Sequence, residues 1–364
     1  MSARNMRNKD KSQTKQGTQS KRSTQSKQDL PKQDTLPKQD TQPKRSTQPT
    51  KLYTPLSPWR GAGGEAVGGE AFWDKALGGI VLLLSLLFLL FQWLVVGLLP
   101  AQVLMVVLFD ALYFAHPVTR RLALTLLPFV LFEMCYDWMR LYPNYLVNDV
   151  DTRGLYEAEL ALFGIATEQG TVIPCAYFNQ HHCALADLLA GLSYLCWVPG
   201  PIALVLWLFF RGQREWAARL SWAFLLVNLI GFMGYYIHPA APPWYVLEHG
   251  FVPNFDTPGN VAGLGRFDQL VGFPVFESIY VNNSNIFAAV PSMHASYMLV
   301  ATIYAVLSRQ PWPLIATCAF ITVGIWFTAV YTSHHYVIDV LLGIVTAMIG
   351  VALFERVERC FVER

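Results

Sequence analysis

Eight long apolar segments constrain the fold of this chain more than any other feature. They cover about residues 76–98, 101–116, 121–139, 186–210, 216–237, 292–308, 312–332 and 336–354. An α-helix needs about twenty residues to cross the hydrocarbon core of a bilayer, where its backbone groups must pair within the segment. Only 14% of the 364 residues are charged and 53% are hydrophobic, which excludes an ordinary soluble domain. The sequence therefore predicts an all-α polytopic membrane protein with about eight transmembrane helices, the second of them short.

The N-terminal segment differs in composition from the rest of the chain. Residues 1–51 hold 13 Lys and Arg against four Asp, a net charge of +9, whereas residues 52–364 hold 14 Lys and Arg against 21 Asp and Glu, a net charge of −7. With almost no apolar residues to build a core, residues 1–70 are predicted to be a disordered basic tail that ends in a Gly-rich linker. Such a tail is attracted to anionic lipid headgroups. Nucleic acid is not an expected partner, because neither aromatic side chains nor a folded nucleic-acid-binding module accompany the basic residues.

The short clusters of arginine orient the predicted bundle. Cytoplasmic loops collect Lys and Arg, and alternating spans place every cluster on the same side as the tail. These clusters are Arg120 and Arg121; Arg211, Arg214 and Arg219; Arg309; and Arg356 and Arg359. We therefore expect both termini to be cytoplasmic. Two long loops, about 140–185 and 238–291, then lie on the opposite face, in a lumen or periplasm.

Two histidines interrupt the apolar segments at this non-cytoplasmic face. His294 begins the sixth segment and His335 the eighth, and Asp339 follows His335 by one helical turn on the same face. A carboxylate at that depth is costly unless it pairs inside the bundle. We expect Asp339 to accept the Nδ1–H of His335, which leaves the other ring nitrogen free to attack phosphorus. His294 would protonate the leaving oxygen and then take the proton of the incoming hydroxyl. This phosphoryl transfer requires no metal or cofactor.

The charge that develops on a phosphoryl group also needs donors. The Lys and Arg residues of the non-cytoplasmic face are Arg140, Arg153 and Arg266. Arg266 is the predicted phosphate ligand, because its loop leads directly into His294. Ser292 is expected to cap the helix of His294 and to direct backbone N–H groups at the phosphate. His334 flanks the site, and the sequence leaves open whether it contacts the substrate.

Several motifs carry a family resemblance. Pro291-Ser292-Met293-His294 and His335-x-x-x-Asp339 resemble the second and third signatures of the type 2 phosphatidic acid phosphatase superfamily, whose members form a phosphohistidine on the second histidine. The segments 236–245, 262–268, 289–295 and 334–339 together resemble the inositol phosphorylceramide synthase branch, the aureobasidin-sensitive enzymes. The resemblance covers about residues 186–354. It implies a six-helix catalytic bundle of the phosphatidic acid phosphatase kind.

The chain departs from the superfamily pattern in two places. A Lys followed after six residues by Arg-Pro is missing, and so is the Ser-Arg that usually precedes the second histidine. The synthase branch shares both losses, which favours that branch. In place of the first signature stands a segment that supplies Tyr236, His238 and Trp244 as candidate substrate-binding residues. Pro242 and Pro243 stiffen this segment, so a purely structural role remains the alternative.

The resemblance and the residues together predict a lipid phosphotransferase. It would move phosphoinositol from a glycerophospholipid donor, phosphatidylinositol, to a ceramide-like acceptor, with the aromatic segments around Trp244 and 273–280 excluding water. The alternatives are a lipid phosphatase or diphosphatase with water as acceptor, a relative that transfers phosphoethanolamine or phosphocholine, and a non-catalytic scaffold or transporter.

The predicted organisation follows from these assignments. After the tail, N-terminal membrane helices occupy 71–140, a non-cytoplasmic loop 141–185, the catalytic membrane core 186–354 and a cytoplasmic C-terminal tail 355–364.

Other polar residues leave alternatives open. Asp110, Glu133 and Asp137 lie in apolar segments, where they indicate either a transport pathway or hydrogen bonding between helices. Cys175 and Cys183 fall in a non-cytoplasmic loop and would pair only in an oxidising compartment. The run His181-His182-Cys183 matches no common zinc spacing. Residues 282–284 form an N-glycosylation sequon, which matters only in a host that glycosylates that face.

Overall fold

The computed structural model describes residues 68–281 and 285–362. The predicted disordered tail up to residue 67 and the sequon at 282–284 lie outside the described residues. Contacts divide the chain into residues 1–50 and 51–364, and all described residues belong to the second unit. Helix α1 begins at Gly68, within the segment predicted as linker.

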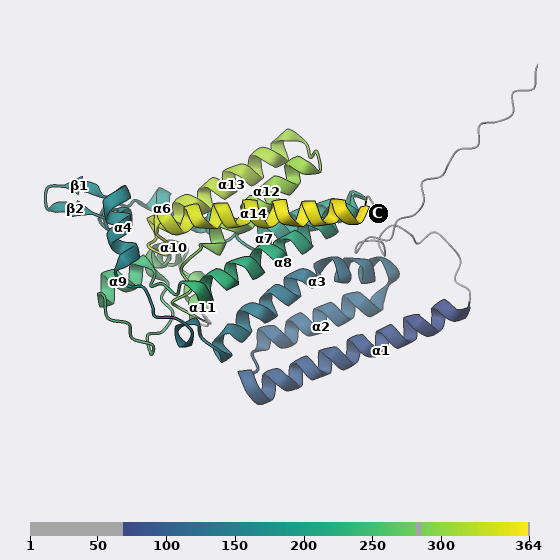
Figure 1. Cartoon of the computed structure of the whole chain (residues 1–364). Coiled ribbons are helices and arrows are strands. Elements are labelled where there is room, and N and C mark those ends of the chain that lie inside the picture. The colour runs from purple at the N-terminus through teal and green to yellow at the C-terminus, as the bar shows by residue number, and fades with distance from the viewer. Residues whose placement is uncertain (1–67, 282–284, 363–364) are drawn as a thin grey trace, which may run out of the picture. The chain divides into compact units, whose positions relative to one another are not determined.

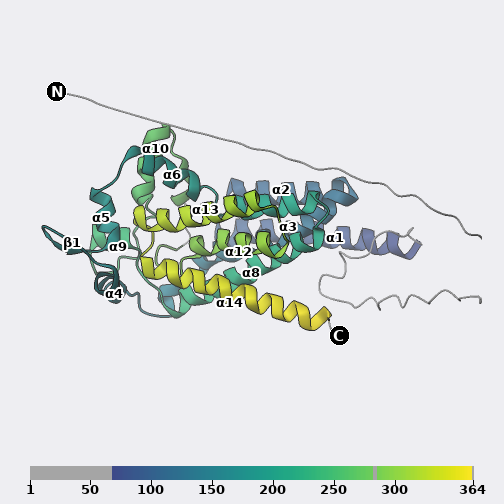
Figure 2. The same ribbon diagram turned by 90° about the horizontal axis from the view of Figure 1, so that it is seen from above.

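The described part of the chain is mainly helical and has very little strand, which confirms the predicted fold class. Apart from α6, its apolar helices lie roughly parallel or antiparallel to one another (Figures 1 and 2). They are α1 (Gly68–Phe91) with its π-helical continuation η2 (Gln92–Val96), α2 (Pro100–Ala115), α3 (Pro117–Trp138), α6 (Ala184–Tyr194), α7 (Pro199–Phe210), α8 (Arg214–Ile237), α12 (Met293–Leu307), α13 (Trp312–Tyr331) and α14 (Val337–Val362).

Five or six spans in the described residues are long and apolar enough to cross a membrane, so the predicted count of eight is not confirmed. Helices α2 and α12 are apolar but have only 16 and 15 residues. The segment predicted as one span at 186–210 is instead two helices, α6 and α7, which are bent by 50° relative to each other. Pro199 and Pro201 open α7. Proline lacks the N–H that a continuous helix would use, and the apolar pattern alone did not reveal this break.

The two long predicted loops contain short elements that gather at one end of the bundle (Figures 1 and 2). The first loop holds η3 (Met139–Leu141), η4 (Asn144–Leu146), α4 (Gly154–Phe163), the antiparallel hairpin β1 (Ile165–Thr167) and β2 (Gly170–Val172), and α5 (Pro174–Gln180). The second loop holds α9 (Pro243–His249), η5 (Ala262–Leu264), α10 (Gly265–Val271) and α11 (Val275–Tyr280). These elements cover the end of the bundle at which α12 and α14 begin.

Helix α12 is the centre of the packing and contacts α7, α8, α13 and α14. A glycine allows the close approach of α14 to α12, because a Cβ on Gly343 of α14 would lie 2.1 Å from the Ser292 carbonyl oxygen. The Ser296 hydroxyl donates to the Gly343 carbonyl at 2.7 Å across the same contact. The starts of α12 and α14 are therefore held side by side.

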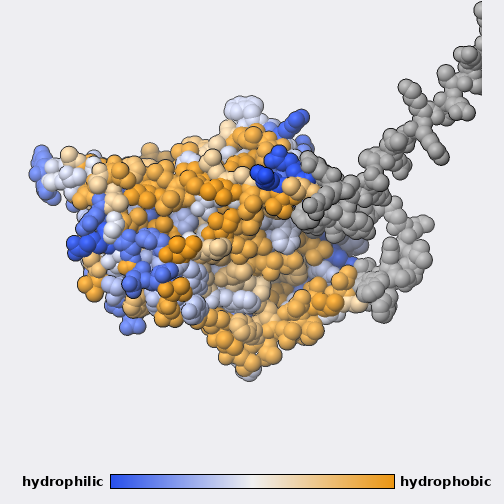
Figure 3. All heavy atoms as spheres, in the orientation of Figure 1, coloured by the Kyte–Doolittle hydropathy of each residue, from blue (hydrophilic) through white to orange (hydrophobic). Residues whose placement is uncertain are grey.

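The outer surface of the helices is apolar over a broad area, and hydrophilic residues gather at the end that carries the short elements (Figure 3). Helix α14 continues beyond the predicted limit at residue 354. Glu355 pairs there with Arg219 of α8 and accepts a 2.7 Å hydrogen bond from the Tyr304 hydroxyl of α12. The predicted C-terminal tail thus begins as helix, because its first charged residue has partners on two other helices.

Candidate active site

Residues from two helices meet where α12 and α14 begin. The Nδ1 atom of His294 lies 3.1 Å from Nε2 of His335. On the other side of the His335 ring, Nδ1 lies 3.5 Å from Oδ2 of Asp339. That oxygen also accepts the Tyr336 N–H at 2.9 Å, and the Asp339 side chain is fully buried. The three residues predicted as catalytic therefore lie in a row from carboxylate to imidazole to imidazole, in which His335 Nδ1 is within ion-pair distance of Asp339 but has no hydrogen-bond partner among the described residues.

The turn that carries two histidines is held by its backbone. This histidine turn, residues 332–336, joins α13 to α14, and the N–H groups of His334 and His335 both donate to the Ala329 carbonyl, at 3.0 and 2.9 Å. Other segments donate to its carbonyl groups: Gly263 N–H to Thr332, Trp244 N–H to Ser333, and the Cys175 thiol to His335. The loops thus help to fix the position of His335 through its backbone.

A buried carboxylate from the first loop caps α14 directly after the histidine turn. Glu159 of α4 accepts the N–H groups of Val337 and Ile338, at 2.9 and 3.2 Å. Burial raises the pKa of Glu159, although these two donors lower it in part. A carboxylate at a helix N-terminus satisfies donors that have no partner within the helix.

Replacing Glu159 with Ala is expected to lower the free energy of unfolding by about 2 kcal/mol, because two buried N–H groups lose their acceptor. The melting temperature of the purified protein in detergent checks this. Glu157→Ala is the matched control: it lies on the same helix, is largely exposed and pairs with Arg153 at 3.6 Å. Equal melting temperatures for the two variants would contradict the capping role.

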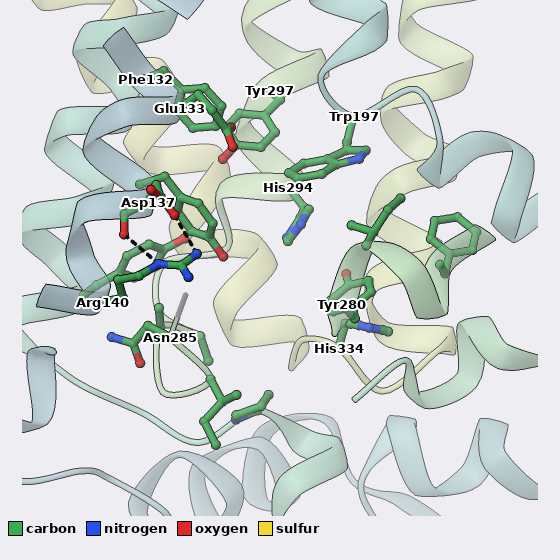
Figure 4. A pocket seen from close by; sticks show the side chains of 18 of the residues that line it. Phe132, Glu133, Asp137, Arg140, Trp197, Tyr280, Asn285, His294, Tyr297 and His334 are labelled. Atoms are coloured by element: carbon green, nitrogen blue, oxygen red, sulfur yellow. Dashed lines mark hydrogen bonds and ion pairs between the residues drawn. The ribbon is translucent and has the colours of Figure 1, made fainter. Parts of the chain in front are cut away.

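The histidines line a cavity of about 550 Å³. Figure 4 shows His294 and His334 on one side of it, and the charged residues Glu133, Asp137 and Arg140 on the other. The walls are mostly aromatic and aliphatic side chains contributed by α2, α3, α6, α8, α11 and α12. The ring of His294 packs on Tyr194 and Trp197, at 5.1 and 4.7 Å between ring centres. The arrangement suits an amphiphilic ligand whose polar group reaches the histidines.

The predicted substrate-binding residues divide into two groups. His334 and Trp244 line the cavity, and Trp244 also borders a second cavity of about 260 Å³. Ser292 is fully buried, caps α12 through its side chain and donates its own N–H to the Asp339 carbonyl at 3.0 Å. The predicted cap is thus confirmed. The Ser292 N–H, however, already donates to the Asp339 carbonyl and is not free to donate to a phosphate.

Arg266, Tyr236 and His238 do not line the cavity of the histidines. Arg266 borders the second cavity, where it pairs with Asp187 at 2.6 Å and donates to the Tyr331 carbonyl at 3.3 Å. The Tyr236 hydroxyl donates to the Tyr142 carbonyl at 2.6 Å. His238 lies 3.3 Å from Asp151 and is half exposed. Contact of these three residues with substrate stays a prediction.

Of the three basic residues expected on the non-cytoplasmic face, the sequence favoured Arg266, whereas Arg140 is the one that lines the cavity. Arg140 pairs with Asp137 at 2.5 Å and faces His294 and His334 across the cavity (Figure 4). It is the only Lys or Arg among the described residues that line this cavity. Position in the chain favoured Arg266, which precedes His294, whereas the fold of α3 against α8 brings Arg140 to the cavity.

The acidic residues of the apolar segments hold helices together. Asp137 accepts hydrogen bonds from Gln92 and Gln102 at 2.8 and 2.7 Å, and Asp110 accepts one from Ser85 at 2.9 Å. For these two residues the alternative of helix–helix hydrogen bonding is confirmed. Glu133 and Asp137 both line the cavity as well. Cys175 and Cys183 are both free thiols in this structure.

Comparison with known proteins places the site in a family. A model described as the PAP2 superfamily matches residues 167–353. The phosphoinositol dihydroceramide synthase of Bacteroides thetaiotaomicron is 53% identical over 275 residues, which cover 76% of this chain and 90% of that protein. The inositol phosphorylceramide synthase of Candida albicans is 30% identical over 182 residues, covering 47% of this chain and 37% of that protein.

The catalytic subunit of the Saccharomyces cerevisiae inositol phosphorylceramide synthase is 27% identical over 194 residues, which cover 49% of this chain and 47% of that subunit. No solved structure matches the chain. The apolar helices and these relatives together make the chain an integral, multi-pass membrane protein. Because the matching family model covers about half of the chain and includes His294, His335 and Asp339, the chain belongs to the PAP2 superfamily.

Proposed function

We propose that this protein transfers phosphoinositol from phosphatidylinositol to the primary hydroxyl of a ceramide-like lipid, releasing diacylglycerol. The observation that carries the proposal is the 3.1 Å contact between His294 and His335 in a cavity lined by apolar side chains. The names of the relatives supply the headgroup and the acceptor class.

In the first step, Nε2 of His335 attacks phosphorus and the bond to the diacylglycerol oxygen breaks. Asp339, on the Nδ1 side of the ring, holds the tautomer that leaves a lone pair on Nε2 and stabilises the positive charge that develops. His294 gives a proton to the departing oxygen. A phosphoryl group does not fit between ring nitrogens 3.1 Å apart, so the two rings must separate when the donor lipid binds.

In the second step, the acceptor hydroxyl attacks phosphorus and the bond to Nε2 breaks. His294, neutral after the first step, takes the proton of that hydroxyl. The ring of His335 is thereby regenerated with its lone pair. Water competes with the lipid alcohol at this stage, and Trp244, Phe276 and Tyr280 on the cavity wall support a water-excluding role for their two segments.

The orientation of the bundle is part of the proposal. The arginines of the loop between α7 and α8, of the loop between α12 and α13, and of the end of α14 follow the cytoplasmic pattern. Both termini would then be cytoplasmic, and the histidines would face a lumen or periplasm. Donor and acceptor lipids would enter from the membrane with their headgroups at that face.

Two arginine variants distinguish a residue that binds the phosphate from one that stabilises the fold around the site. Arg140→Gln is expected to lower kcat/KM by about 10²-fold, because it removes a cavity cation from the phosphoryl oxygens. Its melting temperature should fall less than that of Arg266→Gln, because the buried Asp137 keeps its hydrogen bonds from two glutamines. Arg266→Gln is expected to lower the melting temperature, because it leaves the buried Asp187 without its strongest partner. Initial rates at varied phosphatidylinositol, with melting curves for both variants, check this. A larger kcat/KM loss in Arg266→Gln at unchanged melting temperature would restore Arg266 as the phosphate ligand.

The activity itself is tested with purified protein in vesicles that contain ceramide and inositol-labelled phosphatidylinositol. Label in a ceramide-linked product, with one diacylglycerol formed per product, supports the proposal. Release of labelled inositol phosphate to water without a sphingolipid product would identify a hydrolase. Phosphatidylethanolamine and phosphatidylcholine, supplied as alternative donors, test the headgroup.

A further inference from the structure

The two ring nitrogens of His334 have different environments. Nδ1 lies 3.0 Å from the Thr332 hydroxyl oxygen. That hydroxyl donates its own hydrogen to the Thr328 carbonyl at 2.7 Å. A hydroxyl carries a single hydrogen, so the Thr332 oxygen can only accept from His334. Nδ1 therefore carries the proton of the neutral imidazole, and Nε2 carries a lone pair.

The Nε2 atom of His334 is buried and has no hydrogen-bond partner among the described residues. The side chain is only 4% exposed, and it borders the cavity of the catalytic pair (Figure 4). Burial lowers the pKa of His334 to about 3, with His335 contributing in the same direction. The ring is thus neutral at physiological pH. An unpaired buried acceptor is costly, so a lone pair on a residue that borders the cavity indicates a ligand that supplies a donor when the cavity is filled.

The chemistry of this acceptor restricts what can occupy it. Phosphoryl oxygens carry lone pairs and no hydrogen, so they are repelled by Nε2. An O–H group satisfies it. The ring lies against aromatic surface, with ring centres 4.6 Å from Tyr280 and 5.8 Å from Tyr194. A hydroxyl attached to a bulky, partly apolar body therefore fits this part of the cavity better than water alone.

We propose that His334 binds a substrate hydroxyl through Nε2, beside the phosphoryl group carried by His335, and thereby selects hydroxylated substrates. The inference rests on the proposed function, in which two substrates bring such groups: the inositol ring of the donor and the secondary hydroxyl of the ceramide. His334 follows α13 directly before the nucleophile, so a hydroxyl bound there lies next to the reacting phosphorus. Thr332 fixes the tautomer that makes this possible.

The test removes the residue and the hydroxyl in turn. Transfer is measured with ceramide and with an analogue lacking the secondary hydroxyl, and then with phosphatidylinositol and ring-deoxy analogues, for wild type and His334→Leu. We expect wild type to disfavour the deoxy form of one substrate by about tenfold in kcat/KM, and His334→Leu to lose that preference. The acceptor series and the donor series show which substrate supplies the hydroxyl.

Two further variants keep the outcome interpretable. Thr332→Val retains the imidazole but removes the group that fixes its tautomer, so the preference should shrink even if His334→Leu does not fold. His181→Leu replaces an exposed histidine outside both cavities and should keep the wild-type preference.

The test distinguishes a failure of the inference about His334 from a failure of the proposed function. If His334→Leu and Thr332→Val keep the wild-type preference in both series, or if wild type shows no preference in either, the inference is wrong. If wild type makes no phosphosphingolipid at all, the proposed function fails first and the inference fails with it.

Discussion

His335→Ala should lower the rate of inositol phosphorylceramide formation by about 10⁴-fold or more, because the proposed reaction has no path without the nucleophile. The variant should still fold. The backbone N–H and carbonyl groups that hold residue 335 to Ala329 and Cys175 do not depend on the side chain. Initial rates in vesicles, with labelled donor and saturating ceramide, measure the loss.

The control for this variant is His181→Ala, which removes an exposed imidazole outside both cavities and should retain full activity. Melting curves establish that both variants are folded. A folded His335→Ala protein with more than a tenth of the wild-type rate would contradict a covalent role for His335.

His294→Ala should lower the rate with phosphatidylinositol by about 10³-fold, because diacylglycerol would depart as an alkoxide without a proton. A donor with a nitrophenol leaving group does not need that proton. With such a donor, the variant should release nearly one equivalent of nitrophenol per protein in a rapid burst and then stall, since the acceptor hydroxyl also lacks its base.

This pattern distinguishes proton transfer from a general loss of structure. His294 packs on Tyr194 and Trp197, so a truncated side chain could also disturb the cavity wall. His294→Phe fills that space without a titratable group and should behave as His294→Ala does. Loss of the burst in both variants would contradict the acid–base role and indicate a role in binding.

The convergence of His294, His335 and Asp339 could be predicted from the sequence, because three patterns indicated it. Hydropathy placed both histidines at span ends, arginine clusters put those ends on one face, and the four-residue spacing put Asp339 beside His335. Helical geometry is local, so the sequence determines such spacings directly.

The cavity wall could not be predicted in the same way. Arg140 and Glu133 reach the cavity through the packing of α3 against α8 in three dimensions. Position in the chain favoured Arg266, whose partner Asp187 lies 79 residues away on α6. The bend between α6 and α7 was likewise hidden in a continuous apolar run, where Pro199 and Pro201 carried the only local signal.

The covalent intermediate on His335 is the central claim, and one measurement tests it most directly. Protein in vesicles with inositol-labelled phosphatidylinositol and no ceramide is quenched in alkali, which preserves the acid-labile phosphorus–nitrogen bond, and digested for peptide mass spectrometry. The account predicts phosphoinositol on His335, and its transfer to lipid when ceramide is added before the quench. Turnover without label on His335, or label on another residue that passes to ceramide, would contradict it.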